Sequence, residues 1–283
     1  MCGQRGGGVT RVPAKDRAVV ISVKNLVKNF GSRRILNGIS LDIYAGETLV
    51  VMGGSGCGKS TLLRHLIGSI RPDSGEVWMF DKDIAKANED ELDSIRKRFG
   101  MLFQSGALFD SLTVGDNIAL PLREHTKLDE NVISIIVKMK LELVGLRGFE
   151  DLMPSQLSGG MKKRVGLARA IVMDPRIIFY DEPTAGLDPV MTGVVDKLTM
   201  DLTRKLDITS VVVTHDMGSV FRIADRIVML HQGSILQIGT PEEIKNSTNP
   251  LVQQFITGGA EGPISFVQQG DDYLDHLTAE LKE

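Results

Sequence analysis

A glycine-rich segment with one lysine and two hydroxyl groups is the part of the chain best suited to chemistry. Its residues are Gly53, Gly54, Ser55, Gly56, Cys57, Gly58, Lys59, Ser60 and Thr61. Glycines let a backbone wrap around phosphate oxygens with successive N–H groups pointing inward, and a following helix adds its positive N-terminal end. In the pattern G-x-x-x-x-G-K-[ST], Lys59 supplies a cation for the β- and γ-phosphates, and the Ser60 hydroxyl is a Mg²⁺ ligand.

The sequence around this segment decides between a phosphate-binding loop and a chance glycine turn. Residues 48–52 form an apolar run typical of a buried strand, and residues 60–67 have a helical pattern. A strand before the loop and a helix after it are the context that such a loop requires. The pattern therefore predicts a nucleotide phosphate site.

Two acidic residues, Asp181 and Glu182, follow the apolar run 177–180. A strand buried on both faces would deliver them to its C-terminal edge, where open α/β sheets bind ligands. Asp181 is the candidate Mg²⁺ partner, and Glu182 is the candidate general base for an attacking water. An acidic pair after a strand is by itself often a polar turn or a helix cap. The phosphate loop in the same chain favours the catalytic interpretation.

His215 follows a second apolar run, 209–214, and should also emerge at the end of a core strand. Its imidazole would there bond a γ-phosphate and hold the attacking water or its base in place. A lone histidine is more often structural or simply exposed. The position after a core strand favours the functional interpretation, and the other four histidines have no comparable setting.

Ser158, Gly159 and Gly160 stand between Leu157 and Met161, just before a helical stretch at 162–172. A serine and two glycines at a helix start offer backbone N–H groups and a hydroxyl to a second anion. A plain N-cap with a flexible turn is the alternative. The place of this element, shortly before the acidic strand, favours an anion site.

These elements together resemble the ABC ATPase family over residues 19–245, and the Leu-Ser-Gly-Gly element separates that family from other phosphate-loop enzymes. The resemblance implies an α/β fold: a P-loop NTPase core, an antiparallel β subdomain and an inserted helical subdomain. It also implies ATP and Mg²⁺ as cofactors. Met161 departs from the family's usual glutamine, which should cost little because Ser158 and the glycines make the phosphate contact.

The resemblance assigns three further residues. Phe30 is similar to the family's adenine-stacking aromatic, although that residue is more often tyrosine. Gln104, after the expected strand 99–103, is similar to the glutamine that touches Mg²⁺ and reports to the membrane partner. Asp188 ends a loop, 185–188, that crosses the dimer interface in this family.

The family's geometry also implies a partner. Its serine-glycine element covers ATP that a second subunit holds, so two ATP molecules lie between two chains arranged head to tail. Each nucleotide then favours the closed dimer by differential affinity, and hydrolysis lets the dimer open. We therefore expect a second copy of the chain as a partner.

Composition bounds the remaining possibilities. The chain has 283 residues, 42% hydrophobic and 24% charged, which is enough for one large domain or two coupled lobes. Its net charge of −3 gives no support to a nucleic-acid partner. Two cysteines, one of them in the glycine loop, exclude a disulfide framework. No secretory signal or bilayer-spanning run is expected, so the chain should lie on the cytoplasmic side.

We expect three parts along the chain: a mobile N-terminal tail at 1–17, an ATPase domain at 18–257 with a helical subdomain inserted at about 105–160, and an extension at 258–283. The expected strands are 19–26, 39–43, 48–52, 75–80, 99–103, 177–180 and 209–214, with a hairpin at 227–230 and 234–238; the clearest helices are 60–67, 89–98 and 129–144. The extension carries Phe266, Tyr273, Leu274 and Leu277. Because solvated tails rarely carry several large apolar groups, we expect it to dock on a partner subunit.

The variable segments carry a narrower resemblance. Residues 101–109, 121–126, 139–142, 144–148, 152–154 and 262–266 are similar to the ATPases of Mla (maintenance of lipid asymmetry) systems. That resemblance implies phospholipid movement between two membranes, driven from the cytoplasmic face of the inner membrane. The implied partners are an integral membrane permease, an MCE-type lipid-binding protein and a small STAS-like subunit.

Other functions stay open from sequence alone. An importer ATPase for amino acids or another small solute would keep the same motor, because cargo is chosen by partner proteins. A soluble ABC ATPase acting on DNA or ribosomes usually carries two cassettes or a long coiled-coil insertion, and this chain has one cassette without such an insertion. We also expect part of residues 105–117 to line the groove that receives the permease, because small and apolar residues follow Gln104 directly.

Overall fold

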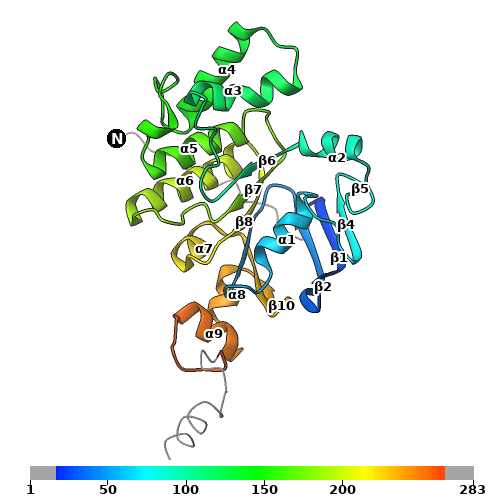
Figure 1. Cartoon of the computed structure of the whole chain (residues 1–283). Helices are drawn as coiled ribbons and strands as arrows, with labels where there is room; N and C mark the ends of the chain where they lie inside the picture. Colours follow the sequence, from blue (N-terminus) through cyan, green and yellow to red (C-terminus); the bar gives the residue numbers. More distant parts are fainter. Residues whose placement is uncertain (1–16, 265–283) are drawn as a thin grey trace, which may run out of the picture.

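The computed structural model describes residues 17–264. The predictions for residues 1–16 and 265–283, including the apolar residues of the C-terminal extension, lie outside the described residues. Within the described range the chain folds around two β-sheets, with helices covering and extending them (Figure 1).

The larger sheet has six strands in the order β10-β9-β3-β8-β7-β6. All neighbours in it are parallel except β9 and β10, which form the antiparallel hairpin expected from the sequence. Its strands are β3 (Thr48–Gly53), β6 (Phe99–Leu102), β7 (Ile177–Asp181), β8 (Thr209–Val213), β9 (Arg226–His231) and β10 (Ser234–Gly239).

The smaller sheet is antiparallel, in the order β2-β1-β4-β5. Its strands are β1 (Val19–Phe30), β2 (Arg33–Tyr44), β4 (Ser74–Met79) and β5 (Lys82–Asp83). It packs on one face of the parallel sheet together with helix α1 (Lys59–Leu66). The sequence predicted both long strands, but too short: β1 runs on to Phe30, and β2 begins at Arg33.

Alternation along the central strands sends side chains into two separate cores. On β3, Leu49 and Val51 join the core under the antiparallel sheet, whereas Val50 and Met52 join the core under the helices. β7 divides in the same way, with Phe179 in the first core and Tyr180 in the second. A strand buried on both faces reads as a continuous apolar run, which is why these strands were predictable.

Of the remaining helices, α2 (Glu89–Arg96) packs in the core under the antiparallel sheet, and the others cover the opposite face and both ends of the molecule. These others are α3 (Val114–His125), α4 (Glu130–Leu143), α5 (Gly159–Ala170), α6 (Pro189–Lys205), α7 (Met217–Ile223), α8 (Pro241–Lys245) and α9 (Pro250–Thr257), with a 3₁₀ turn at η2 (Pro154–Gln156). In Figure 1, α3 and α4 project at one end and α9 lies at the other. No helix of residues 17–264 combines the length and the apolar character needed to cross a bilayer.

Two predicted boundaries differ from the structure in ways that matter for the site. Helix α5 begins at Gly159, not at residue 162, because Ser158 caps it and both glycines adopt helical geometry in its first turn. Strand β6 ends at Leu102, so Phe103 lies outside the sheet and is 43% exposed. The α/β class, with an antiparallel sheet beside the parallel one, is confirmed.

Helix α5 lies unusually close to strand β6. A Cβ atom on Gly100 would lie 2.1 Å from the carbonyl oxygen of Ala170, and one on Gly166 would lie 3.0 Å from the carbonyl oxygen of Gly106. Glycine at both positions allows the helix to pack directly on the strand and on the loop that follows it. This close packing fixes where α5 lies relative to the sheet edge.

We expect Gly100→Ala to destabilise the protein by about 1–3 kcal/mol, because the added methyl group pushes α5 away from β6. Gly193→Ala is the matched control. Gly193 lies inside α6 with no neighbour within 4 Å of an added Cβ, so alanine there should stabilise by about 0.5–1 kcal/mol. Thermal unfolding of both variants checks the pair. Equal midpoints would contradict the close-packing interpretation.

Candidate functional site

The glycine loop lies between β3 and α1, as the sequence predicted, and its backbone conformation requires glycine at several positions. Gly53, Gly56 and Gly58 have φ values of +149°, +74° and +107°, in the region that side chains rarely adopt. A Cβ on Gly53 would lie 2.3 Å from the Leu230 carbonyl oxygen, and one on Gly58 would lie 2.7 Å from Leu36 Cδ2. The loop is therefore seated on β9 and β2 by backbone that no larger residue could replace.

Lys59 places its ammonium group directly on this loop. Its Nζ donates to the carbonyl oxygens of Gly53, at 2.7 Å, and Gly54, at 3.0 Å. Ser60 and Thr61 follow it in the first turn of α1, and the Ser60 side chain is exposed. A fixed cation and a free hydroxyl thus stand at a helix N-terminus, which is the arrangement that binds phosphate.

Cys57 differs from its neighbours because its side chain faces inward. It is buried, and burial raises the pKa of its thiol. A Cβ on Gly53 would lie 2.7 Å from its Sγ atom. Cys57 thus supports the loop from below, and only its backbone can face a ligand.

Strand β7 ends at Asp181, and Glu182 follows with a φ of +48°, a left-handed conformation that is unusual for glutamate. The Glu182 amide donates to the Val213 carbonyl at 2.8 Å, and its Oε1 atom lies 2.8 Å from Nδ1 of His215. The structure therefore brings together the acid and the histidine that the sequence singled out. Strain at such a position is common where a side chain must be aimed at a ligand.

Asp181 lies in a more shielded environment. Burial raises the pKa of its carboxyl, and the nearby charge of Glu182 raises it further, against the lowering effect of Arg64 and Lys59. A carboxylate that is short of solvent and close to a second carboxylate favours the arrival of a cation. The Glu182 side chain is 15% exposed and that of His215 is 67% exposed, so the histidine lies at the rim.

The serine-glycine element lies apart from the phosphate loop. Ser158 caps α5 by accepting from the Met161 amide at 3.3 Å, and Gly159 is exposed with no neighbour within 4 Å of an added Cβ. Among the hydrogen bonds of residues 17–264, none joins this element to the loop at 53–61. One chain therefore presents an exposed helix tip that makes no hydrogen bond to its own phosphate loop.

The three residues assigned by resemblance lie at the surface. The Phe30 ring is 51% exposed, and the Lys28 ammonium lies 5.6 Å from its centroid. Gln104 is exposed two residues after β6. Asp188 caps α6, accepting from the amides of Val190 and Met191. That cap gives Asp188 a structural role which the sequence did not reveal.

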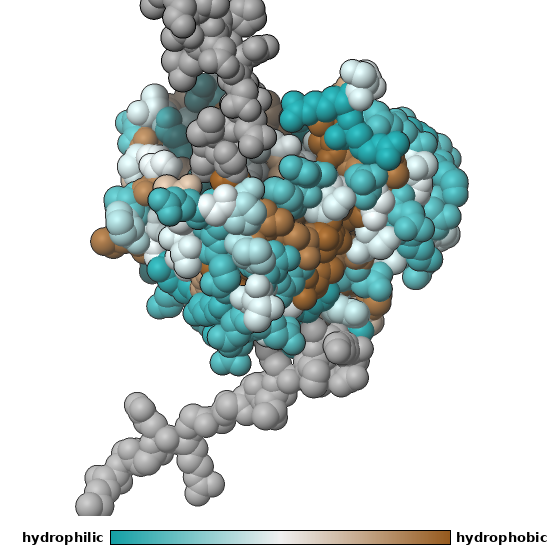
Figure 2. Space-filling view, turned by 90° about the horizontal axis from the view of Figure 1, so that it is seen from below, coloured by the Kyte–Doolittle hydropathy of each residue, from teal (hydrophilic) through white to brown (hydrophobic). Residues whose placement is uncertain are grey.

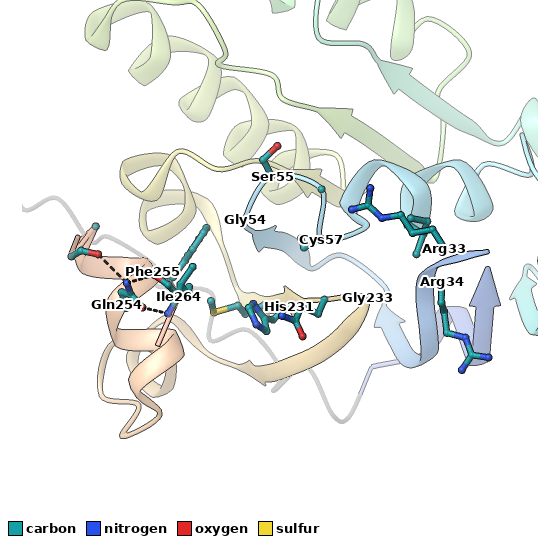
Figure 3. Close-up of a pocket in the computed structure, with 16 residues that line it drawn as sticks. Arg33, Arg34, Gly54, Ser55, Cys57, His231, Gly233, Gln254, Phe255 and Ile264 are labelled. Carbon is teal, nitrogen blue, oxygen red and sulfur yellow. Dashed lines mark hydrogen bonds between the residues drawn. The ribbon is translucent and has the colours of Figure 1, made fainter. Parts of the chain in front are cut away.

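A cavity of about 670 Å³ lies beside the phosphate loop (Figure 3). It is lined by Arg33, Arg34, Ile35, Gly54, Ser55, Gly56, Cys57, Met229, His231, Gln232, Gly233, Gln254, Phe255, Gly258, Gly259 and Ile264. Lys59, Asp181 and Glu182 do not line this cavity, and neither does Ser60. The cavity therefore flanks the loop.

The turn of the predicted β9–β10 hairpin makes contacts that the sequence did not indicate. The Gly233 amide donates to the Cys57 carbonyl at 3.2 Å, and the Asn37 amide donates to the Gly233 carbonyl at 2.8 Å. This turn thus joins the phosphate loop to β2. The glycine between the two strands was the only sequence signal, and it indicated a hairpin without indicating what the hairpin holds.

Comparison with known families identifies this arrangement. The model of the ABC transporter family matches residues 36–185, more than half of the chain. The chain belongs to this family. It is therefore an ATP-binding subunit whose ATPase activity is coupled to transport, and the ABC form of the fold expected from the sequence is confirmed.

Individual ABC proteins are similar over most of the chain. The "Intermembrane phospholipid transport system ATP-binding protein MlaF" of Haemophilus influenzae is 45% identical over 91% of this chain and 98% of its own length. MlaF of Escherichia coli is 44% identical over 90% and 95%. The "Probable ribonucleotide transport ATP-binding protein mkl" of Mycobacterium leprae is 46% identical over 94% of this chain and 76% of its own length.

Solved ABC cassettes share the fold. The dimeric cassette MJ0796 in a post-hydrolysis state bound to ADP and phosphate superposes with a TM-score of 0.72, at 31% identity, over 78% of this chain and 98% of that one. The cbiO1 subunit of Clostridium perfringens, part of the transporter complex cbiONQ, gives a TM-score of 0.75 at 27% identity over 94% of this chain and 99% of that one.

Lys59→Ala should abolish ATP binding and ATP hydrolysis together, because it removes the ammonium group held at the centre of the phosphate loop. Lys86→Ala is the control, since that side chain is 72% exposed and pairs with Asp83 far from the loop. Fluorescent-nucleotide titration and phosphate release measure the two properties. Normal nucleotide affinity in the Lys59 variant would contradict this role.

Proposed function

We propose that two copies of this chain clamp two ATP molecules head to tail, each site formed by the phosphate loop of one copy and the Ser158 helix tip of the other. Two features support this. Ser60 is exposed and the His215 side chain is 67% exposed, so the candidate site reaches the surface, and the Ser158–Gly159 tip is exposed and makes no hydrogen bond to the loop of its own chain. The similar cassette MJ0796 is dimeric. A site left open by one copy is closed by the other.

Mg²⁺ fits the candidate site as the second cofactor. Ser60 offers a hydroxyl at the start of α1, Asp181 offers a carboxylate at the end of β7, and Gln104 offers an amide oxygen after β6. These are the oxygen ligands that Mg²⁺ prefers. Residues 17–264 hold no cluster of three His, Cys, Asp or Glu that would bind a metal alone. Few protein ligands are expected where the phosphates of the substrate complete the coordination of Mg²⁺. The ion would then neutralise phosphate charge when ATP is bound.

Hydrolysis is then carried out by groups on two strand ends. Lys59 and the loop amides hold the β- and γ-phosphates, and Asp181 and Ser60 would hold the Mg²⁺ that neutralises phosphate charge. Glu182 takes a proton from the attacking water. His215, at 2.8 Å from Glu182, orients that carboxylate and reaches toward the γ-phosphate. Phe30 presents an open ring face for adenine, and the Asp188 loop borders the second site.

Glu182→Gln should keep ATP binding and lose roughly 10²–10⁴-fold of turnover, because the amide cannot accept the proton. With ATP it should also accumulate as a closed dimer. Light scattering after gel filtration, with and without ATP, measures the dimer, and phosphate release measures turnover.

Glu242→Gln, an exposed change on α8, is the control and should behave as the wild type. A Glu182 variant that turns over normally would remove the general-base assignment. A Glu182 variant that binds ATP without forming a dimer, both alone and when purified with its native partners, would refute the proposal that two copies share each site.

The cargo that we propose is phospholipid, moved between the inner and outer membranes by a complex with a permease, an MCE-type protein and a STAS-like subunit. The supporting observation is how much of each relative is matched. This chain covers 95–98% of the two MlaF proteins but 76% of mkl, although identity is nearly equal. Nearly the whole of MlaF thus has a counterpart in this chain, which fits the same assembly on the cytoplasmic face of the inner membrane.

Purification of the tagged chain from its native membranes tests this proposal. We expect a permease and an MCE-domain protein to accompany it, and ATP to move labelled phospholipid out of vesicles that contain the complex. Labelled ribonucleotides and amino acids are the competing probes. ATP-driven uptake of either, with no phospholipid movement, would overturn the lipid assignment and leave the ATPase assignment intact.

The loop after Gln104 is the proposed permease contact. Around it Phe103 and Phe109 are 43% and 51% exposed, and Ala107 is also exposed. Apolar residues also gather in a patch on the face seen from the α9 end of the molecule, which Figure 2 views. Exposed aromatic side chains beside a small residue fit a groove for an apolar helix of a partner.

Ala107→Glu should abolish co-purification of the permease and leave ATP binding unchanged, because it places a charge in that groove. Ala107→Ser is the matched control, since it keeps a small uncharged side chain at the same backbone conformation. Quantitative pull-down and nucleotide titration give the two readouts. Intact co-purification of the Glu variant would count against this contact surface.

A further inference from the structure

A buried lysine, Lys163, lies one turn inside helix α5 and has no part in the function described so far. Its side chain is buried, with the residue 5% exposed. Its Nζ donates to the carbonyl oxygen of Ala185 at 2.5 Å. Among the described residues this is the one hydrogen bond that its ammonium makes. A buried charge costs free energy, so a lysine kept there with one neutral partner calls for an explanation.

The partner carbonyl belongs to the loop that directly follows the general base. The Ala185 amide donates to the Glu182 carbonyl at 3.2 Å, and the Leu187 amide donates to the Thr184 carbonyl at 3.1 Å. The residues 182–187 thus form two successive tight turns. Lys163 lies outside this loop and donates to Ala185, whose own amide donates to the Glu182 carbonyl.

Glu182 depends on such support because its own backbone is strained. Its φ of +48° persists only where surrounding contacts hold it. The Val213 carbonyl holds its amide from the side of β8. Lys163 holds the following loop through the Ala185 carbonyl, and its positive charge also acts on the Glu182 carboxylate.

The same stretch of α5 contacts the loop a second time. A Cβ on Gly160 would lie 2.7 Å from Cε of Met191, so the first turn of α5 packs directly on the first turn of α6. The segment from Ala185 to Met191 therefore contacts α5 at two points, at Lys163 and at Gly160. Movement of the Ser158 tip of that helix would act on this segment through these contacts.

We propose that Lys163 is a positioning residue: through the Ala185 carbonyl it aims Glu182 and couples it to the Ser158 tip of the same chain. In the ATP dimer, the tip lies on the nucleotide of the partner copy. When the Ser158 tip of one copy docks on the partner's nucleotide, it thereby positions Glu182 of its own copy for the nucleotide that this copy holds. This inference rests on the proposed dimer for the coupling, whereas the aiming of Glu182 requires only the single chain.

Lys163→Met removes the charge and the hydrogen bond and keeps an unbranched side chain of similar length. We expect kcat for ATP to fall about tenfold or more, the scale of a hydrogen bond to a charged group that is lost in the transition state. Affinity for a non-hydrolysable ATP analogue should stay within about twofold, because the phosphate loop is untouched. The thermal midpoint should not fall, because an apolar residue suits a buried site.

Two further variants separate aiming from simple packing. Lys163→Arg keeps a cationic donor and should restore kcat to within about threefold of the wild type. Lys197→Met removes an exposed lysine on the neighbouring helix α6 and should change nothing. The Hill coefficient for ATP hydrolysis in the native complex should fall toward 1 in Lys163→Met alone.

The outcomes divide cleanly. Wild-type kcat in a folded Lys163→Met protein would overturn the proposal, and so would a parallel loss of thermal midpoint, analogue affinity and kcat. If Glu182→Gln forms no ATP dimer, the proposed function fails instead. In that case a lowered kcat of Lys163→Met, restored by arginine, would still support the aiming of Glu182.

Discussion

The register of three parallel strands is the constraint on which the site depends. Val213 of β8 is paired with Val51 of β3 on one side and with Asp181 of β7 on the other. The Thr214 amide bonds the Val51 carbonyl, and the Glu182 amide bonds the Val213 carbonyl. Because the three strands end level, the phosphate loop, the acidic pair and His215 leave the sheet at one edge. A shift of one residue in any strand would turn these groups to the wrong face.

Helix α5 is the second organising element. It packs so closely on β6 and the following loop that only glycine fits at two positions of the contact. Gly100 and Gly166 let its backbone approach β6 and the loop after Gln104, and Arg169 donates to the carbonyls of Gly106 and Ala107 at 2.9 Å each. The same helix starts at the Ser158 tip. This rigid helix joins the loop after Gln104, the Ser158 tip and the loop 182–187, which are far apart in sequence. A small movement of one of them can therefore be transmitted to the others.

The sequence was sufficient wherever a local pattern carries its own physical reason. The glycine loop, the acidic pair and His215 were predictable because each follows a strand whose apolar run is unmistakable. The start of α5 was predicted too late, because two glycines argue against a helix and only the Ser158 cap outweighs them. The Gly233 contact and the Lys163 bond could not be predicted, since each joins residues 20 or more positions apart and neither residue type signals its partner. The structure places the residues of the glycine loop, the acidic pair and His215, whereas the roles assigned to them, and to Phe30, Gln104 and Asp188, stay predictions.

Because Cys57 is buried under the phosphate loop, its chemical reactivity can report when the loop opens. The thiol is covered by the loop, and burial raises its pKa, so it should react slowly with alkylating reagents while the loop is closed. The chain has one other cysteine, Cys2, which would compete for the reagent, so it is first replaced by serine. In the Cys2→Ser variant, the rate at which a maleimide modifies Cys57 measures how often the loop opens.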